Sequence, residues 1–144
     1  MTKSTVCVDA NLVIKLAIEE EASDRAREKW AEWQRGDTEV VAPSLLPYEV
    51  TSVLRNNVHR GLVLPDEASD ALAELLSLPA SVISAPDIHQ RAWRLATEFG
   101  RPNAYDAHYL AVAEMMDCPF WTADRRLATA VAGFASGVHV VGQL

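Results

Sequence analysis

Short apolar runs rich in β-branched residues alternate along this 144-residue chain with longer segments whose apolar residues recur every three or four positions. The short runs lack polar alternation, which is typical of strands covered on both faces, and the longer segments have helical periodicity. We expect strands at residues 5–8, 39–42, 81–84, 119–122 and 138–141. We expect helices at residues 11–20, 22–35, 43–61, 65–78, 86–99, 104–117 and 123–133. This pattern predicts an α/β fold with a parallel sheet of about five strands between helix layers, formed by one domain over residues 1–144.

Two of the predicted helices carry an acidic residue on an otherwise apolar face. Asp106 shares a face with Tyr109 and Leu110, because the three residues are spaced by three or four positions. Glu49 in the same way shares a face with Leu46. A carboxylate on a face that packs against a core needs a charged partner or a metal ion. Asp106 and Glu49 are therefore candidate catalytic or metal-binding residues.

Two further acids follow predicted strands. Asp9 comes directly after the first strand, and Asp124 follows the Trp121–Thr122 end of the fourth. Side chains at the carboxyl ends of parallel strands meet at one edge of the sheet, which is where ligands bind in open α/β folds. Helices entered from those strand ends begin at the same edge, so we expect Asp106 and Glu49 to join the first two acids there.

Four converging carboxylates would repel one another strongly without a cation. Two of them about 4 Å apart repel by roughly 4 kcal/mol at an effective dielectric constant near 20. Ligation by oxygen alone favours Mg²⁺ or Mn²⁺ over zinc, which prefers His or Cys. The histidines are not spaced as metal ligands, so we expect ordinary surface or core roles for His59, His89, His108 and His139.

Each acid also has a structural alternative. Asn103 and Asp106 have the spacing of a capping box, Asp9 or Asn11 can cap the first helix, and Asp124 can cap the last. Glu49 lies too far into its helix to cap it, so its alternative is an ion pair with an arginine such as Arg101. One shared cause for four acids is the simpler interpretation.

Composition limits the class of protein. Hydrophobic residues make up 49% of the chain and charged residues 23%, which is typical of a globular protein. The net charge of −7 excludes a protein that coats nucleic acid by bulk electrostatics, although it allows a nucleic-acid enzyme with locally grouped basic residues. Lys15, Arg101, Arg125 and Arg126 are the candidates for such contacts. No signal-peptide layout or membrane-spanning run is visible, and Cys7 and Cys118 have no metal spacing, so we expect reduced thiols, a cytoplasmic location and no membrane association.

Four segments in this order, "VDANLVIKL", the helical Glu49, "AYDAHYLAVAE" and "FWTADRRL", resemble the PIN-domain nucleases, and among them the VapC-type toxins of bacterial toxin–antitoxin pairs. The resemblance covers nearly the whole chain. It implies a Rossmann-like parallel sheet with an acidic pocket that binds Mg²⁺ or Mn²⁺. It also implies endoribonuclease activity, a homodimer and inhibition by a small VapB-like antitoxin.

By match to these motifs, the acidic positions are taken by Asp9, Glu49, Asp106 and Asp124, and the polar supporting positions by Asn11 and Thr122. Position 11 often carries a small hydroxyl residue in the family, whereas this chain has an amide. In the implied mechanism, Asp9 and Asp106 ligate the main ion and Glu49 holds the attacking water. Asp124 serves a second ion or orients the first site.

Two other functions are compatible with parts of the pattern. An aspartate-based phosphotransfer domain also has acids at strand ends, but it needs a lysine near the phosphate, and no lysine follows a late strand here. A non-catalytic interaction module would use the acids only as helix caps. The helical stripe that contains Trp30 and Trp33 is expected to pack on the core, with a groove for an antitoxin segment as the alternative.

Overall fold

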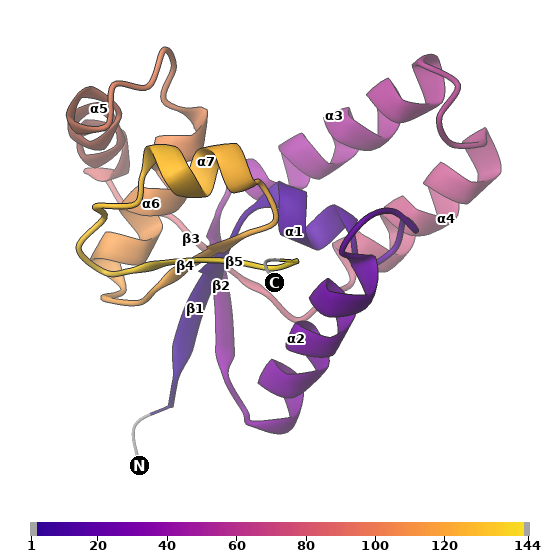
Figure 1. Cartoon of the computed structure of the whole chain (residues 1–144), viewed down its shortest axis with the longest axis horizontal. Coiled ribbons are helices and arrows are strands. Elements are labelled where there is room, and N and C mark those ends of the chain that lie inside the picture. The colour runs from indigo at the N-terminus through magenta and orange to yellow at the C-terminus, as the bar shows by residue number, and fades with distance from the viewer. Residues whose placement is uncertain (1–2, 143–144) are drawn as a thin grey trace.

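The computed structural model describes residues 3–142 and contains a parallel sheet of five strands in the order β3-β2-β1-β4-β5 (Figure 1). The strands are β1 (Thr5–Val8), β2 (Glu39–Pro43), β3 (Ser81–Ile83), β4 (Phe120–Thr122) and β5 (Val138–Val140). All four pairings are parallel, with Cys7 opposite both Val41 and Phe120. The strand order reverses direction from β1, so β1 and β4 flank the point at which a ligand site is expected.

Seven helices connect and cover the described strands. They are α1 (Ala10–Ile14), α2 (Ser23–Arg35), α3 (Leu45–His59), α4 (Pro65–Leu76), α5 (Ile88–Glu98), α6 (Tyr105–Met115) and α7 (Arg125–Ala130). In Figure 1, α5 and α6 lie on one side of the sheet and α2 on the other, while α3 and α4 form a paired arm that extends away from it. The predicted α/β fold with helix layers on both sides is confirmed.

The core consists of the central strands and the helix faces packed on them. α6 contacts β1, β2 and β4, and its buried residues are Ala107 and the run from Tyr109 to Ala113. The prediction that Trp30 and Trp33 pack on the core is confirmed, since both are buried and their rings meet edge to face. The free thiols of Cys7 and Cys118 are buried as well, and burial raises the pKa of both, that of Cys118 to about 11.

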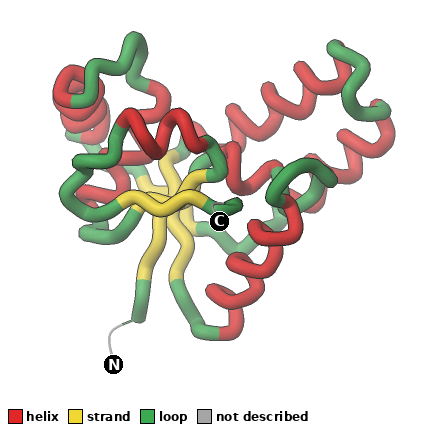
Figure 2. The backbone as a smooth tube through the Cα atoms, viewed as in Figure 1, coloured by secondary structure: helices red, strands yellow, loops and turns green. Residues whose placement is uncertain are grey.

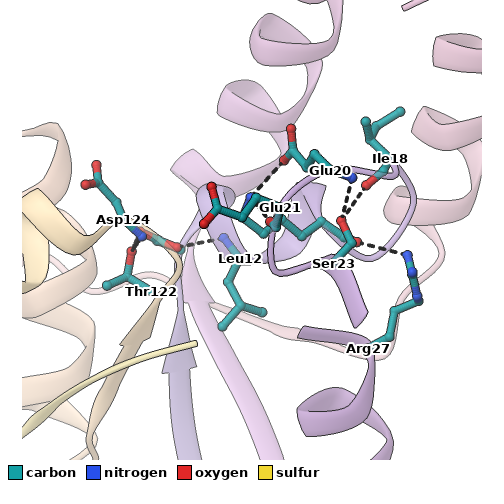
Figure 3. Close-up of polar contacts among 10 residues, drawn as sticks. Leu12, Ile18, Glu20, Glu21, Ser23, Arg27, Thr122 and Asp124 are labelled. Atoms are coloured by element: carbon teal, nitrogen blue, oxygen red, sulfur yellow. Dashed lines mark hydrogen bonds and ion pairs between the residues drawn. The ribbon is translucent and has the colours of Figure 1, made fainter. Parts of the chain in front are cut away.

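The structure corrects several element boundaries (Figure 2). The first helix was expected at residues 11–20 but ends at Ile14, because the following amides bond to carbonyls three residues back and the chain turns. Ser23 closes this loop: its hydroxyl accepts a hydrogen bond from the Glu20 amide and donates one to the Ile18 carbonyl (Figure 3). Ala22 has a left-handed φ of 68°, so α2 begins one residue later than expected.

Two further expectations need correction. Pro43 ends β2 instead of starting a helix, although Gly61, with φ 74°, does follow the end of α3 as predicted. The edge strands β3 and β5 are not covered on both faces, and Val82 is exposed. Continuous apolar runs identified these strands, but only β1, β2 and β4 have the burial that such runs predict. No helix within residues 3–142 has the length and apolar content needed to cross a membrane.

Candidate functional site

Asp9 is the most constrained acid of the site. It directly follows β1, and its side chain is only 3% exposed. Its Oδ1 accepts a hydrogen bond of 3.0 Å from the Leu12 amide, which caps the start of α1. Its Oδ2 accepts one of 2.5 Å from the Thr122 hydroxyl and a longer one, 3.4 Å, from the Asn11 side-chain amide. Three donors from two elements therefore fix this carboxylate at the carboxyl end of the central strand.

Thr122 links the ends of the two neighbouring strands. Its fully buried hydroxyl donates to Asp9 and accepts a hydrogen bond of 3.0 Å from the Asp124 amide (Figure 3). Asp124 in turn caps α7, because its Oδ1 accepts from the Leu127 amide at 3.1 Å. The predicted supporting position of Thr122 therefore corresponds to a real bridge between two of the candidate acids. The capping roles weighed for Asp9 and Asp124 are also real.

The pKa of Asp9 is raised to about 7. Burial is the main cause, and the negative charge of Asp106 adds to it, while the hydrogen bonds from Thr122, Leu12 and Asn11 oppose it. A buried carboxylate beside a second one favours either a proton or a cation. This electrostatic arrangement is what a cation-binding site provides.

Glu49 and Asp106 reach the same region from α3 and α6. Burial raises the pKa of Glu49, and so does the charge of Asp106, whereas the Tyr109 hydroxyl and His108 lower it. Asp106 interacts with both other acids, so the structure brings Asp9, Glu49 and Asp106 into one electrostatic cluster. Asp124 is joined to this cluster through Thr122 and the strand ends.

Arg101 pairs with Asp106, at 3.2 Å between Nη2 and Oδ2, and not with Glu49 as the alternative interpretation supposed. The capping-box alternative is also wrong for Asp106, because the N-cap of α6 is Ala104, with no side-chain cap bond. Asn103 instead accepts a hydrogen bond of 3.3 Å from the Tyr105 amide. Asp106 therefore caps no helix, and among the described residues its ion-pair partner is Arg101.

The chemistry of the donors fits a hard divalent cation, since the cluster offers carboxylate oxygens only. Within residues 3–142, however, no three acidic, His or Cys side chains are grouped closely enough to hold a metal ion as they stand. Glu49 and Asp106 are half-buried on helices, whereas Asp9 is buried at the end of β1.

The predicted basic residues lie near this edge, and they differ in their hydrogen-bond partners. Lys15 bonds Glu20 and the Glu21 carbonyl, and Arg125 donates to the Gly142 carbonyl at 2.6 Å. Arg126 is exposed on α7.

Two features were missed by the sequence interpretation. The Tyr109 hydroxyl is buried beside Glu49, yet no hydrogen bond of ordinary geometry reaches it from any described residue. In the sequence, the only sign of this hydroxyl is that Tyr109 shares a helix face with Asp106, and that spacing also predicts ordinary core packing. His89 and His108, far apart in sequence, have ring nitrogens 2.8 Å apart.

Comparison with known proteins decides the family. A family model described as PIN domain matches residues 6–132. The chain belongs to the PIN domain family. This PIN domain is 35% identical over 123 residues to Ribonuclease VapC3 of Pyrobaculum aerophilum, which covers 84% of this chain and 90% of the relative. It is 30% identical over 86 residues to Ribonuclease VapC9 of Mycobacterium tuberculosis, which covers 60% of this chain and 65% of the relative.

Solved structures share the fold of this PIN domain. PAE2754 from Pyrobaculum aerophilum superposes with a TM-score of 0.67 at 27% identity, covering 92% of this chain and 90% of that one. VapC20 of Mycobacterium tuberculosis, a toxin that cleaves the sarcin–ricin loop, superposes with a TM-score of 0.65 at 19% identity, covering 91% and 97%. The resemblance to VapC-type PIN domains inferred from the motifs is confirmed.

Proposed function

We propose that this protein is a metal-dependent endoribonuclease and the toxin of a toxin–antitoxin pair. The observation that carries the proposal is the buried Asp9 carboxylate, fixed by Leu12 and Thr122 and set electrostatically against Asp106. The ribonuclease names of its VapC relatives support the same activity.

In the proposed mechanism, Asp9 and Asp106 would hold Mg²⁺ or Mn²⁺ directly, and Asp124 would serve a second, weaker site or orient the first. When bound, such an ion neutralises the phosphate and lowers the pKa of a bound water. Glu49 orients the attacking water, which its half-buried position at the cluster allows. Thr122 and Asn11 keep the Asp9 carboxylate in one orientation through their hydrogen bonds.

The RNA contacts are inferred from the positions of the basic residues along the chain, whereas the assembly and the inhibitor follow from the family resemblance. We assign the RNA contacts to Arg101, Arg125, Arg126 and Lys15, which lie around the same edge. We further propose a homodimer, inhibition by a VapB-like antitoxin, and action in the cytoplasm. The free, buried cysteines fit a reducing compartment.

The capping roles of Asp9 and Asp124 favour one second candidate, a non-catalytic interaction module. In that case the acids stabilise helix starts and bind no metal. The phosphotransfer alternative is weaker, because both oxygens of Asp9 accept hydrogen bonds and its side chain is almost fully buried.

Cleavage of total cellular RNA by antitoxin-free protein separates these functions. We expect discrete cuts with Mn²⁺ or Mg²⁺ that disappear in chelator and in Asp106→Asn, with the new 5′ ends read by sequencing. Asp117→Asn is the matched control, because Asp117 is an exposed acid beyond the other end of α6. Full cleavage by Asp106→Asn would exclude the assignment. The absence of both cleavage and calorimetric Mn²⁺ binding would favour the interaction module.

A further inference from the structure

A cavity of about 330 Å³ opens at the carboxyl edge of the sheet, where β2 ends. Its lining comes from the end of β2 and from the starts of α3, α5 and α6. Two lining residues, Tyr48 and Tyr105, directly precede Glu49 and Asp106 in the chain. A third, His108, acts electrostatically on Glu49. The cavity therefore adjoins the parts of α3 and α6 that carry Glu49 and Asp106.

The walls of the cavity present large aromatic surfaces to solvent. Tyr48 is 75% exposed and Tyr105 is 60% exposed. Among the residues that the structure describes, neither ring stacks on another aromatic ring. Ile88 at the start of α5 adds a buried apolar surface to the lining. Such uncovered faces suit a flat, apolar partner that stacks on them.

The polar side chains of the lining are hydroxyls and imidazoles. His108 is oriented by the Ala104 carbonyl, which its Nδ1 approaches at 2.6 Å, and its Nε2 meets His89 Nδ1 at 2.8 Å. This leaves His89 Nε2 for an outside partner, since no described residue bonds it. No Lys, Arg, Asp or Glu lines the cavity. With two uncovered aromatic rings and one imidazole nitrogen available, the lining matches a planar heterocycle.

We propose that this cavity binds one unpaired nucleobase of the RNA strand, adjacent to the phosphodiester at the carboxylate cluster. Tyr48 and Tyr105 supply the stacking faces, and His89 supplies a hydrogen bond to an edge of the base. The inference rests on the proposed function for the identity of the strand, and it adds a separate site for a base beside the site proposed for the phosphodiester.

Nucleosides are the probe that isolates the cavity, because they carry a base but no phosphate. Each of the four is titrated into antitoxin-free protein in chelator, and the ring resonances of the tyrosines and histidines are followed by NMR. We expect saturable shifts for at least one nucleoside, with affinity about tenfold weaker in Tyr48→Ala and in Tyr105→Ala. Tyr48→Phe and Tyr105→Phe keep the ring and should retain binding.

Trp93→Ala is the matched control, because Trp93 is as exposed as Tyr48, at 75%, but lies outside the cavity lining. It should bind nucleosides like the parent protein, and thermal melts verify that every variant folds. The inference is overturned if no nucleoside shifts the cavity resonances at millimolar concentration, or if the alanine variants bind as tightly as the parent.

Cleavage kinetics then separate this inference from the proposed function. We expect the tyrosine-to-alanine variants to raise KM about tenfold and to change kcat less. Nucleoside binding without any metal-dependent cleavage would refute the nuclease and leave the base site standing. Cleavage with an unchanged KM, together with a weakened dimer or antitoxin complex in the alanine variants, would identify the cavity as a protein interface and refute the base site.

Discussion

The two halves of the carboxylate cluster are held in different ways. Asp9 follows a central strand, is buried, and accepts hydrogen bonds on both oxygens. Asp106 and Glu49 stand half-buried on helices, and Asp106 is held only by Arg101. The strand half is thus fixed by hydrogen bonds, whereas the helix half is more exposed. In the proposed metal site, the hydrogen bonds of Asp9 would therefore orient this carboxylate before a cation binds.

Asp9→Asn should show the largest effect, on both activity and stability. We expect RNA cleavage to fall below detection. Because the pKa of Asp9 is raised to about 7, the native state holds a proton that the unfolded chain has lost. Wild-type stability therefore falls as the pH rises from about 4 to about 7, by at most about 4 kcal/mol. Asp9→Asn should abolish this fall and raise Tm at pH 7.5. Denaturant unfolding at several pH values measures it, and an unchanged pH dependence would contradict the assignment.

Thr122→Val removes the bridge within the strand half. The pKa of Asp9 should rise further, because the hydroxyl that lowers it is lost. Without that donor, and with the Asp124 amide unpaired, the protein should lose about 1–3 kcal/mol of stability. Cleavage should fall about 10- to 100-fold. Thr129→Val, an exposed change on α7, is the control and should have little effect. If Thr122→Val and Thr129→Val have the same Tm and the same cleavage rate, the hydrogen-bond bridge at Thr122 is contradicted.

Tyr109→Phe tests the effect of the Tyr109 hydroxyl on Glu49 in the helix half. The hydroxyl lowers the pKa of Glu49, so its removal should raise that pKa and shift the acidic limb of the pH–rate profile upward. Stability should stay the same or increase slightly, because a buried hydroxyl without an ordinary hydrogen bond is removed. A profile that does not move would mean that Tyr109 only fills space.

Arg101→Gln should change the free energy of unfolding by less than about 1 kcal/mol, because its ion pair with Asp106 is partly exposed. Removing the guanidinium frees Asp106, so calorimetric Mn²⁺ affinity should increase. Weaker Mn²⁺ binding would show that Arg101 supports the site instead of competing with the cation.

The strand half was accessible to sequence reasoning and the helix half only in part. Asp9 and Asp124 could be placed because each follows a strand by one or two residues, and parallel strands share their carboxyl edge. Glu49 was identified by its position on an apolar face, but its approach to Asp106 depends on how α3 and α6 pack. The contact between His89 and His108 has no local signature, because it joins two helices through tertiary packing. The early end of α1 was missed because its apolar pattern continues past Ile14 while the backbone turns.

The buried thiols have a practical consequence for work on this protein. Cys7 lies under α6, with its Sγ directed at the Tyr109 carbonyl, and the pKa of both cysteines is raised. A thiol that stays protonated and inaccessible in the folded chain does not react with iodoacetamide, whereas the unfolded chain reacts readily. The fraction of alkylated chains therefore measures how many molecules have unfolded. Mass spectrometry of labelled samples would report how often the chain opens, in a cell extract as well as in a cuvette.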